Sequence, residues 1–263
     1  MLALIDGDEI IFKAACATTV EEDWDDPFGA SQKVAASFAD CRRALRTMMD
    51  SWVEAAGCDD LLVCLSPPDR KLFRRGLFPT YKAGRGSKPE HYSALEAYVR
   101  ETYEIEERPG LEADDVLGIL SGDTAVICSS DKDMKTIPGR LYNPGKKTLG
   151  VISESRADWQ WMYQTLMGDS TDGFSGCLGC GPKGAEDTLE RGSTLRDWYP
   201  LVLDTYMRPK KGKFREVTQT ADDLRVQAAL ARILRPQDID DYGHVRYSLG
   251  PIKYDFNAIE IAA

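Results

Sequence analysis

The sequence contains few histidines and no hydrophobic run long enough to cross a membrane. Its only two histidines are His91 and His244, so a catalytic Ser-His-Asp triad is poorly supported. A transmembrane helix needs about 18 consecutive apolar residues, and no apolar stretch of this chain approaches that length. The opening segment, residues 1–6, is too short for a signal peptide and has no basic flank. We therefore expect a cytoplasmic protein that does not contact membranes.

The seven cysteines do not form a recognisable disulfide or zinc pattern. Their number is odd and several lie in apolar runs, which is typical of reduced thiols in a reducing compartment. Cys177 and Cys180 form a C-x-x-C segment. A structural zinc site would need a second such pair or nearby histidines, and the thioredoxin-like pattern of strand and helix is absent. The sequence thus predicts neither a zinc site nor a redox role for these two residues.

The charge of the chain is unevenly distributed. The net charge of −10 argues against unspecific adhesion to DNA. Residues 70–88, however, carry seven Lys or Arg side chains and no Asp or Glu, which leaves a charge of −17 on the remainder. A run of one sign inside an acidic protein favours an anionic partner for that segment.

Hydrophobic patterning predicts an α/β protein in which strands and helices alternate up to about residue 152. Short buried strands are expected at 2–5, 61–65 and 125–129, and a hairpin should pair 140–142 with 149–152. Helices are expected at 32–55, 89–103, 112–120, 156–167, 183–190, 194–206 and 222–234. This alternation indicates a doubly wound, mostly parallel sheet followed by a helical region.

Acidic residues follow each of the three expected strands. Asp6 and Asp8 come after the first strand, Asp69 after the second, and Asp131 and Asp133 after the third. Because open α/β sheets build their sites at the carboxyl ends of their strands, these side chains should meet at one edge. Two more acidic clusters lie at a helix start and in a loop: Glu112, Asp114 and Asp115, and Asp169 and Asp172.

Carboxylates that converge in this way require cations. Without them, mutual repulsion raises the pKa of each carboxyl group. Ligand sets made only of oxygen suit Mg²⁺ or Mn²⁺ rather than zinc, and two such ions about 3.5–4 Å apart are the usual apparatus for in-line phosphoryl hydrolysis. Single members such as Asp8 could instead be helix caps or turn formers, but five clusters in register with the strand ends favour a metal site.

The acidic, basic and glycine-rich motifs occur in a characteristic order. They are Ile5–Phe12, Phe73–Arg75 with Phe78–Arg85, Glu112–Gly118, Ser130–Lys135, Gly168–Gly173 and Gly176–Gly184. From about residue 2 to 235, this set resembles the phage and bacterial 5′→3′ exonuclease and flap endonuclease family, which has a PIN-like fold. The likeness is greatest to the small early-gene exonucleases of short-tailed bacteriophages, and for a phage-encoded member it implies the host cytoplasm.

The resemblance implies roles for individual residues. The implied metal ligands, direct or through water, are Asp6, Asp69, Glu112, Asp114, Asp115, Asp131, Asp133, Asp169 and Asp172. Lys82 would stabilise charge on the scissile phosphate with help from Arg85, and Asp131 is counted with them as catalytic. The family usually has its aspartate directly at the end of the second strand, whereas Ser66-Pro-Pro precedes Asp69 here.

The resemblance also implies contacts with DNA. The implied DNA-binding residues are Arg74, Arg75, Tyr81, Lys82, Arg85, Gly179, Gly181 and Lys183. Tyr81 would stack on the terminal base or, as an alternative, pack in the core beside Pro79. The glycines would let backbone N–H groups approach phosphates, and a potassium ion is expected at this turn.

The implied organisation has three parts and one activity. Residues 1–152 would form a PIN-like core with a helical arch at about 70–104, residues 153–235 a helical region with a helix–two-turn–helix motif, and residues 236–263 a tail. The implied activity is divalent-metal-dependent 5′→3′ exonuclease or flap endonuclease action that releases 5′-phosphorylated products. Expected substrates are double-stranded DNA with 5′ ends, 5′ flaps and RNA–DNA hybrids, with no nucleotide cofactor.

Three other functions stay open from the residues alone. Asp6-Gly-Asp8 after a strand also suggests a haloacid-dehalogenase-type phosphatase, in which the first aspartate is the nucleophile, but that leaves the basic segment 70–88 unexplained. A non-catalytic DNA-binding module would not need converging carboxylates, which oppose phosphate binding when metal is absent. A PIN-type ribonuclease would usually be shorter and lack the glycine-rich turn.

Overall fold

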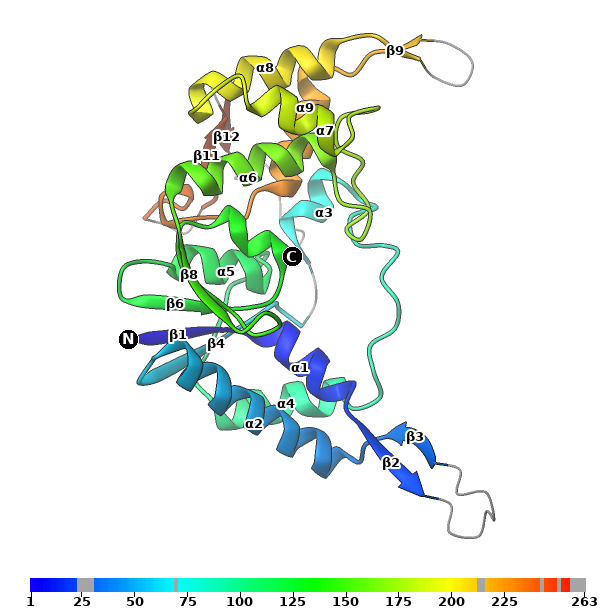
Figure 1. Cartoon of the computed structure of the whole chain (residues 1–263), viewed down its shortest axis with the longest axis vertical. Coiled ribbons are helices and arrows are strands. Elements are labelled where there is room, and N and C mark those ends of the chain that lie inside the picture. Colours follow the sequence, from blue (N-terminus) through cyan, green and yellow to red (C-terminus); the bar gives the residue numbers. More distant parts are fainter. Residues whose placement is uncertain (23–30, 69–70, 212–215, 242–243, 250–251, 256–263) are drawn as a thin grey trace.

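A six-stranded sheet forms the centre of the molecule (Figure 1). The computed structural model describes residues 1–22, 31–68, 71–211, 216–241, 244–249 and 252–255. The strands lie in the order β5 (Ile105–Glu107), β4 (Asp60–Leu65), β1 (Leu2–Asp6), β6 (Ala125–Cys128), β7 (Gly139–Asn143) and β8 (Thr148–Ile152). All neighbours are parallel except β7 and β8, which form an antiparallel hairpin at one edge. The predicted doubly wound, mostly parallel sheet is confirmed.

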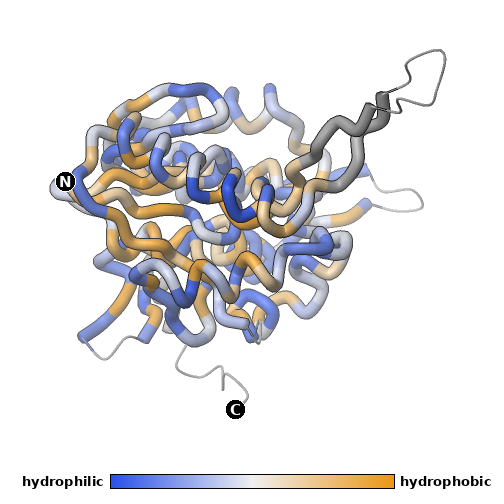
Figure 2. Tube along the Cα trace, turned by 90° about the horizontal axis from the view of Figure 1, so that it is seen from below, coloured by the Kyte–Doolittle hydropathy of each residue, from blue (hydrophilic) through white to orange (hydrophobic). Residues whose placement is uncertain are grey.

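Helices cover both faces of this sheet. One face packs against α1 (Gly7–Ala15), α2 (Phe38–Ala56) and α4 (Tyr92–Thr102). The other packs against α5 (Ala113–Leu120), beyond which lie α6 (Glu154–Met167), α7 (Pro182–Leu189), α8 (Leu195–Met207) and α9 (Ala221–Ala231). Strand β1 serves both cores, because Ala3 and Ile5 belong to the first and Leu4 to the second. Figure 2 shows such apolar segments running through the interior.

The sequence placed the start of α2 too early. Residues 31–35 form strand β3 (Ser31–Ala35), which pairs with β2 (Thr18–Glu22) in a hairpin. The helix begins only after Ser37, whose hydroxyl oxygen accepts a hydrogen bond from the Asp40 backbone N–H, with an N–O distance of 3.2 Å. Such an N-cap stabilises a helix by about 1 kcal/mol. The capping residue was therefore a better marker of the boundary than the apolar pattern.

Several short elements were not predicted. They include helix α1 and the 3₁₀ helices η1 (Lys132–Thr136) and η2 (Pro236–Asp238). Two further hairpins pair β9 (Lys210–Lys211) with β10 (Glu216–Val217), and β11 (Arg246–Leu249) with β12 (Ile252–Asp255). In the described part of the chain, no helix is long and apolar enough to span a membrane.

The segment between α3 (Phe73–Leu77) and α4 links the two groups of helices along one side of the molecule (Figure 1). Its residues 78–91, all of which are described, contain turns and no helix or strand. Helix α4 begins at Tyr92 instead of residue 89. The helical structure expected at about 70–104 is therefore confined to α3 and α4, while the turns between them carry Lys82 and Arg85.

Candidate active site

A cleft opens at the carboxyl ends of β1, β4 and β6. It has a volume of about 990 Å³, and its acidic lining comprises Asp6, Asp8, Glu9, Glu112, Asp114 and Asp131. An adjoining hollow of about 360 Å³ is lined by Asp114, Asp131, Asp133, Asp169 and Asp172. The structure thus brings most of the predicted metal ligands together at one edge of the sheet. The two exceptions are Asp115, described below, and Asp69, which lies outside the described residues.

Asp6 connects the end of β1 to the helix that follows it. Its carboxylate caps α1 by accepting a hydrogen bond from the Glu9 backbone N at 3.0 Å, and it accepts a second from the Ser129 hydroxyl at 2.8 Å. Burial, together with repulsion from Glu9 and Asp8, raises the pKa of Asp6 to about 7. A capping role and a place at the metal site are therefore compatible in this residue.

The start of α5 carries two carboxylates with different surroundings. Glu112 receives hydrogen bonds from Arg74 Nη1 at 2.9 Å and from the Tyr81 hydroxyl at 3.0 Å, and it forms an ion pair with Lys82. Burial opposes ionisation of Glu112, but Lys82 and Arg74 outweigh it and hold its pKa below the usual range. Asp114 lines both the cleft and the hollow, and among the described residues its carboxylate has no hydrogen-bond or ion-pair partner. Burial and the nearby carboxylate of Asp6 raise the pKa of Asp114 well above its ordinary value.

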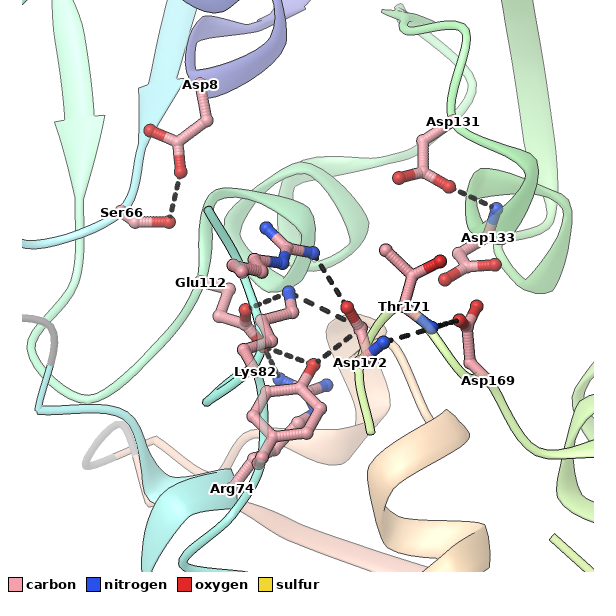
Figure 3. Close-up of polar contacts among 12 residues, drawn as sticks. Asp8, Ser66, Arg74, Lys82, Glu112, Asp131, Asp133, Asp169, Thr171 and Asp172 are labelled. Carbon is pink, nitrogen blue, oxygen red and sulfur yellow. Dashed lines mark hydrogen bonds and ion pairs between the residues drawn. The ribbon is translucent and has the colours of Figure 1, made fainter. Parts of the chain in front are cut away.

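The opposite wall is built from the loop after β6 and the loop after α6. Asp131 is exposed and caps η1 through the Asp133 backbone N at 2.8 Å. Asp133 is half-buried, and burial together with repulsion from Asp131 raises its pKa to about 7. Asp169 is paired with Lys132 at 2.7 Å, and although burial opposes it, this pair lowers the pKa of Asp169. Figure 3 shows Asp131, Asp133 and Asp169 facing Glu112 across Asp172.

Two cations cross the cleft from the turns after α3. The Lys82 ammonium forms an ion pair with Glu112 and lies 3.5 Å from Asp172 Oδ2, while Arg85 Nη2 donates to Asp172 Oδ1 at 2.7 Å. Lys82 has a positive φ of 56°, which is uncommon for a non-glycine residue. Its backbone N–H donates to the Asp172 carbonyl at 2.9 Å, so the strained turn is tied to the acidic loop. Burial alone would lower the pKa of Lys82, but Glu112, Asp114 and Asp172 raise it, and the side chain stays charged.

The donor set fits divalent cations. Its groups are carboxylate oxygens, which suit Mg²⁺ or Mn²⁺, and the raised pKa of Asp114 marks a carboxylate without enough positive charge nearby. In the described part of the chain, no group of three or more His, Cys, Asp or Glu side chains is arranged so that it could hold a metal ion. Lys82 lies between Glu112 and Asp172 instead (Figure 3). The chemistry of these residues therefore suits divalent metal ions. For Glu112 and Asp172 to bind a metal, Lys82 must leave them and pair with another anion.

Two of the expected DNA-binding residues have buried side chains in the structure, which does not favour their contact with DNA. Arg74 is 2% exposed and Tyr81 is 3% exposed. Arg74 binds Asp115 with both terminal nitrogens, at 2.6 and 2.7 Å. The Tyr81 hydroxyl is within hydrogen-bond distance of Glu112 at 3.0 Å and of Asp172 at 3.1 Å, and in this structure its buried ring presents no face to a base. The alternative expectation for Tyr81, packing in the core, agrees with the structure.

Asp115 does not face the cleft. It is fully buried, and besides Arg74 it accepts hydrogen bonds from the backbone N of Glu112 at 3.2 Å and of Leu234 at 3.1 Å. Its two oxygens are therefore occupied within the core, which contradicts the expectation that Asp115 is a metal ligand. The i+3 spacing from Glu112 that suggested a shared site is the spacing of a capping box, which this pair forms at the start of α5.

The glycine-rich turn lies at the start of α7. Gly179, Gly181 and Lys183 are exposed, Gly181 is the N-cap residue of α7, and Gly179 has a φ of 70°. The turn is anchored to the core by Gly176, whose backbone N–H donates to Gln227 Oε1 at 2.7 Å. Pro182 at the first position of α7 has no N–H, so the first backbone N–H groups of this helix that could bind an anion are those of Lys183 and Gly184.

Other cleft residues were missed at the sequence level. Glu9 accepts hydrogen bonds from the backbone N of Ser130 at 2.7 Å and from the Ser129 hydroxyl at 2.8 Å. Ser66, which looked like an interruption before Asp69, donates to Asp8 at 2.6 Å and accepts from the Ala113 backbone N at 3.0 Å. A helix starting at Gly7 would have revealed Glu9, whereas nothing in the sequence indicated Ser66.

Phe12 is a further unpredicted feature of this cleft. It lies on the wall formed by α1 and is 48% exposed, which is unusual for a phenylalanine in a chain with a well-filled core. Arg75 and Lys88 line the same cleft. An exposed ring beside cations is a suitable surface for a nucleotide base and its phosphate.

Comparison with known proteins gives matches over most of the chain. Residues 1–146 match the family model described as 5′-3′ exonuclease, N-terminal resolvase-like domain. The exonuclease of Escherichia phage T7 is 30% identical over 89% of this chain and 88% of its own length. The exodeoxyribonuclease of Enterobacteria phage T3 is 29% identical over 93% of this chain and 90% of its own length.

Solved structures with the same fold come from bacteriophage T5. The T5 D15 protein co-crystallised with metal ions has a TM-score of 0.61 at 17% identity and covers 90% of both chains. The T5 D15 flap endonuclease in a pseudo-enzyme-product complex with DNA and metal ions has a TM-score of 0.54 at 16% identity, covering 88% of this chain and 85% of that one. At these identities the likeness concerns the fold.

Proposed function

The chain belongs to the family of 5′-3′ exonucleases with a resolvase-like N-terminal domain, and we propose that it hydrolyses phosphodiester bonds at the 5′ ends of duplex DNA with divalent cations held in the acidic cleft. As a family member it is a nuclease. Nothing in the comparisons supports a haloacid-dehalogenase-type phosphatase or a PIN-type ribonuclease.

One observation carries this proposal. Carboxylates from four separate segments meet at one sheet edge, where they face Lys82 and Arg85. Acidic ligands for hard cations and basic groups for a phosphate are both needed for phosphodiester hydrolysis.

We assign the metal ligands to two groups on facing walls. The first group consists of Asp6, Glu112 and Asp114, and the second of Asp131, Asp133, Asp169 and Asp172. Two ions, Mg²⁺ or Mn²⁺, would polarise the scissile phosphate and neutralise charge that develops on it. Asp69 keeps its expected place as a ligand, and Asp8, held by Ser66 and Tyr92, would support the first group without direct contact.

The Lys82 ammonium and the Arg85 guanidinium would contact the scissile phosphate of the substrate. In the structure both are neutralised by Glu112 and Asp172. In the substrate complex Lys82 would exchange these carboxylates for a phosphate oxygen, where its positive charge offsets the charge gained in the transition state. Arg85 would bind the same phosphate at its other oxygens, since a guanidinium can donate two parallel N–H hydrogen bonds to a phosphate.

DNA would extend from the cleft to the start of α7. Arg75 lies in the cleft wall, and Gly179, Gly181 and Lys183 would bind the phosphate backbone of the duplex, with K⁺ at this turn. Contacts of this kind fix the position of DNA without reading its sequence. We therefore expect action on 5′ flaps and on the RNA strand of RNA–DNA hybrids as well as on simple duplex ends.

A set of 5′-labelled substrates tests the proposal. The full-length chain is incubated with a blunt duplex, a 5′-flap duplex and an RNA–DNA hybrid, in Mg²⁺, in Ca²⁺ and in EDTA. We expect labelled 5′-phosphorylated mononucleotides or short oligonucleotides in Mg²⁺ alone, and DNA binding without cleavage in Ca²⁺. Cleavage that starts at 3′ ends, or that persists in EDTA, would overturn it.

A further inference from the structure

Cys177 and Cys180 lie at the two ends of one tight turn. The Cys180 backbone N–H donates to the Cys177 carbonyl at 3.0 Å, and the third residue, Gly179, has a φ of 70°. A β-turn of this kind holds its first and fourth Cα atoms within about 7 Å, and disulfides span Cα distances of roughly 4.4–6.8 Å. The backbone therefore already has the shape that a Cys177–Cys180 disulfide requires.

A lysine from a distant segment lies against the first of these thiols. Lys210 Nζ is 3.1 Å from Cys177 Sγ, and hydrogen bonds to the carbonyls of Thr205 at 2.8 Å and Tyr206 at 3.3 Å hold it there. A fixed cation beside a cysteine favours the thiolate, which is the reactive form. The sequence could not show this contact, because Lys210 follows Cys177 by more than 30 positions.

The surroundings separate the two thiols into different chemical roles. The hydrogen bond from Cys180 and the charge of Lys210 outweigh burial and lower the pKa of Cys177 to about 6. The same contact with Cys177 and burial raise the pKa of Cys180. By contrast, burial, with a further contribution from Cys58, raises the pKa of Cys128 far above its ordinary value. The surroundings thus favour ionisation of Cys177 over that of Cys180.

We propose that Cys177 and Cys180 are a site of reversible covalent oxidation by small peroxides, with Cys177 as the attacking sulfur and Lys210 as the residue that activates it. The Cys177 thiolate attacks hydrogen peroxide, so that an S–O bond forms, the O–O bond breaks and hydroxide leaves. Cys180 sulfur then attacks Cys177 sulfur, which forms the S–S bond and breaks the S–O bond. The thiol proton leaves with the departing hydroxide as water. Two thiols lose two electrons and the peroxide is reduced to water.

The size of the oxidant follows from burial. Cys177 is 2% exposed and Cys180 is half-buried, so a water-sized peroxide fits the site better than a bulky disulfide reagent. The turn also touches the acidic loop, since a side chain at Gly176 would collide with the Gly168 backbone nitrogen at 2.3 Å. Oxidation would therefore act on the turn that joins the proposed DNA site to the loop of Asp169.

Mass mapping of the full-length chain tests this proposal without any nuclease assay. The reduced protein is treated with a few equivalents of hydrogen peroxide at pH 7, quenched with acid and N-ethylmaleimide, and digested. We expect an internal Cys177–Cys180 disulfide that forms before Cys16 is modified and is reversed by dithiothreitol. Cys16 is a matched internal control because it is an exposed thiol of the same chain. Modification of Cys16 first, with no disulfide in the turn, would overturn the proposal.

Substitution of Lys210 tests its role. In Lys210→Met the pKa of Cys177 should rise. At pH 5 every tenfold loss of thiolate is offset by only about a threefold rise in intrinsic nucleophilicity, so disulfide formation should slow by about threefold. Above pH 9 the order of rates should reverse, and Lys210→Arg should keep the original profile. In Cys180→Ser a sulfenic acid should be trapped at Cys177 by dimedone. Identical pH profiles for Lys210→Met and the unmodified chain, with melting curves showing that both are folded, would refute the activating role.

Discussion

Arg74 and Asp115 form a bidentate ion pair in the core beneath the cleft, with Nη1–Oδ2 and Nη2–Oδ1 distances of 2.6 and 2.7 Å. Arg74 also donates to Glu112 and to the carbonyl of Arg232 just after α9. One guanidinium thus joins α3, the start of α5 and the end of α9. It fixes the acidic edge of the sheet against the helical region, which is a structural task and not a contact with DNA.

Replacement of Arg74 is expected to destabilise the fold. Arg74→Met leaves Asp115 as an unpaired charge in the core, and breaking a buried pair in this way costs about 3–5 kcal/mol. Arg75→Met is the matched control, because the neighbouring side chain is exposed and lines the cleft. It should leave the free energy of unfolding unchanged but weaken DNA binding and its dependence on salt. Denaturant unfolding and binding titrations separate the two; equal stability of both variants would show that the buried pair is unimportant.

Loss of the Lys82 side chain should affect turnover more than binding. Lys82→Ala removes a charge that we place on the scissile phosphate, and removal of one such group typically lowers kcat by about 10²–10³-fold. Arg85→Ala should have a smaller effect, because the Arg85 side chain is more exposed than that of Lys82. Single-turnover cleavage and DNA affinity in Ca²⁺ provide the two readouts. If affinity falls while the single-turnover rate is kept, Lys82 is a docking residue.

Asp131 is the clearest test of the ligand assignment. Its carboxylate is exposed and accepts a hydrogen bond that caps the short helix η1, so Asp131→Ala should alter the melting temperature only slightly. Cleavage in Mg²⁺ should be lost. Asp197→Ala, which removes an exposed carboxylate that accepts a hydrogen bond from the Thr194 backbone N–H at the start of α8, is the control and should leave cleavage intact. An active Asp131→Ala protein would remove this residue from the metal site.

The sequence predicted the sheet and the acidic edge because both follow from local patterns. Short apolar runs ended by Asp located β1 and β6, and strand ends of a parallel sheet share one edge. The contents of the core could not be read in this way. Arg74 and Arg75 are identical neighbours in the sequence, yet one is buried and the other exposed, and only the packing of α3 against α9 decides which.

Side chains from distant segments explain the other differences. Tyr81 and Phe12 are both aromatic residues near the acidic motifs. Tyr81 is buried because its hydroxyl donates hydrogen bonds to Glu112 and Asp172. Phe12 has no polar group to bury and lies on the outer side of a short helix that the periodicity did not reveal. Burial of the Tyr81 ring depends on partners 31 and 91 positions away in the sequence, and such partners leave no local signal.

Divalent cations should stabilise the fold more at high pH than at low pH. Burial raises the pKa of Asp133 and of Asp6 to about 7, from an unfolded value near 3.8. Because the folded pKa is the higher one, the folded state binds these protons more tightly, and the resulting stability is full below about pH 4 and is lost as pH rises through 7. Above that pH the carboxylates of Asp6 and Asp133 are ionised, and a bound divalent cation would neutralise their charge in place of the lost protons. The gain in melting temperature on adding Mg²⁺ should therefore be small at pH 5 and larger at pH 8, and a gain independent of pH would contradict this linkage.

Phe12 is expected to take the stacking role that its exposure permits. Its ring is 48% exposed in the cleft that also contains Lys82 and Arg75. Stacking of a base on an aromatic side chain contributes about 1–3 kcal/mol, so Phe12→Ala should weaken binding of a 5′ end by roughly fivefold to a hundredfold or more, while Phe12→Trp should retain it. Tyr81→Phe keeps its buried ring and is the aromatic control; it should not change affinity for DNA ends. Affinities measured in Ca²⁺ for blunt and frayed duplexes separate these outcomes. Stacking predicts that the loss in Phe12→Ala is greater for a frayed end than for an internal nick flanked by paired bases, because only an unpaired base can lie flat on the ring.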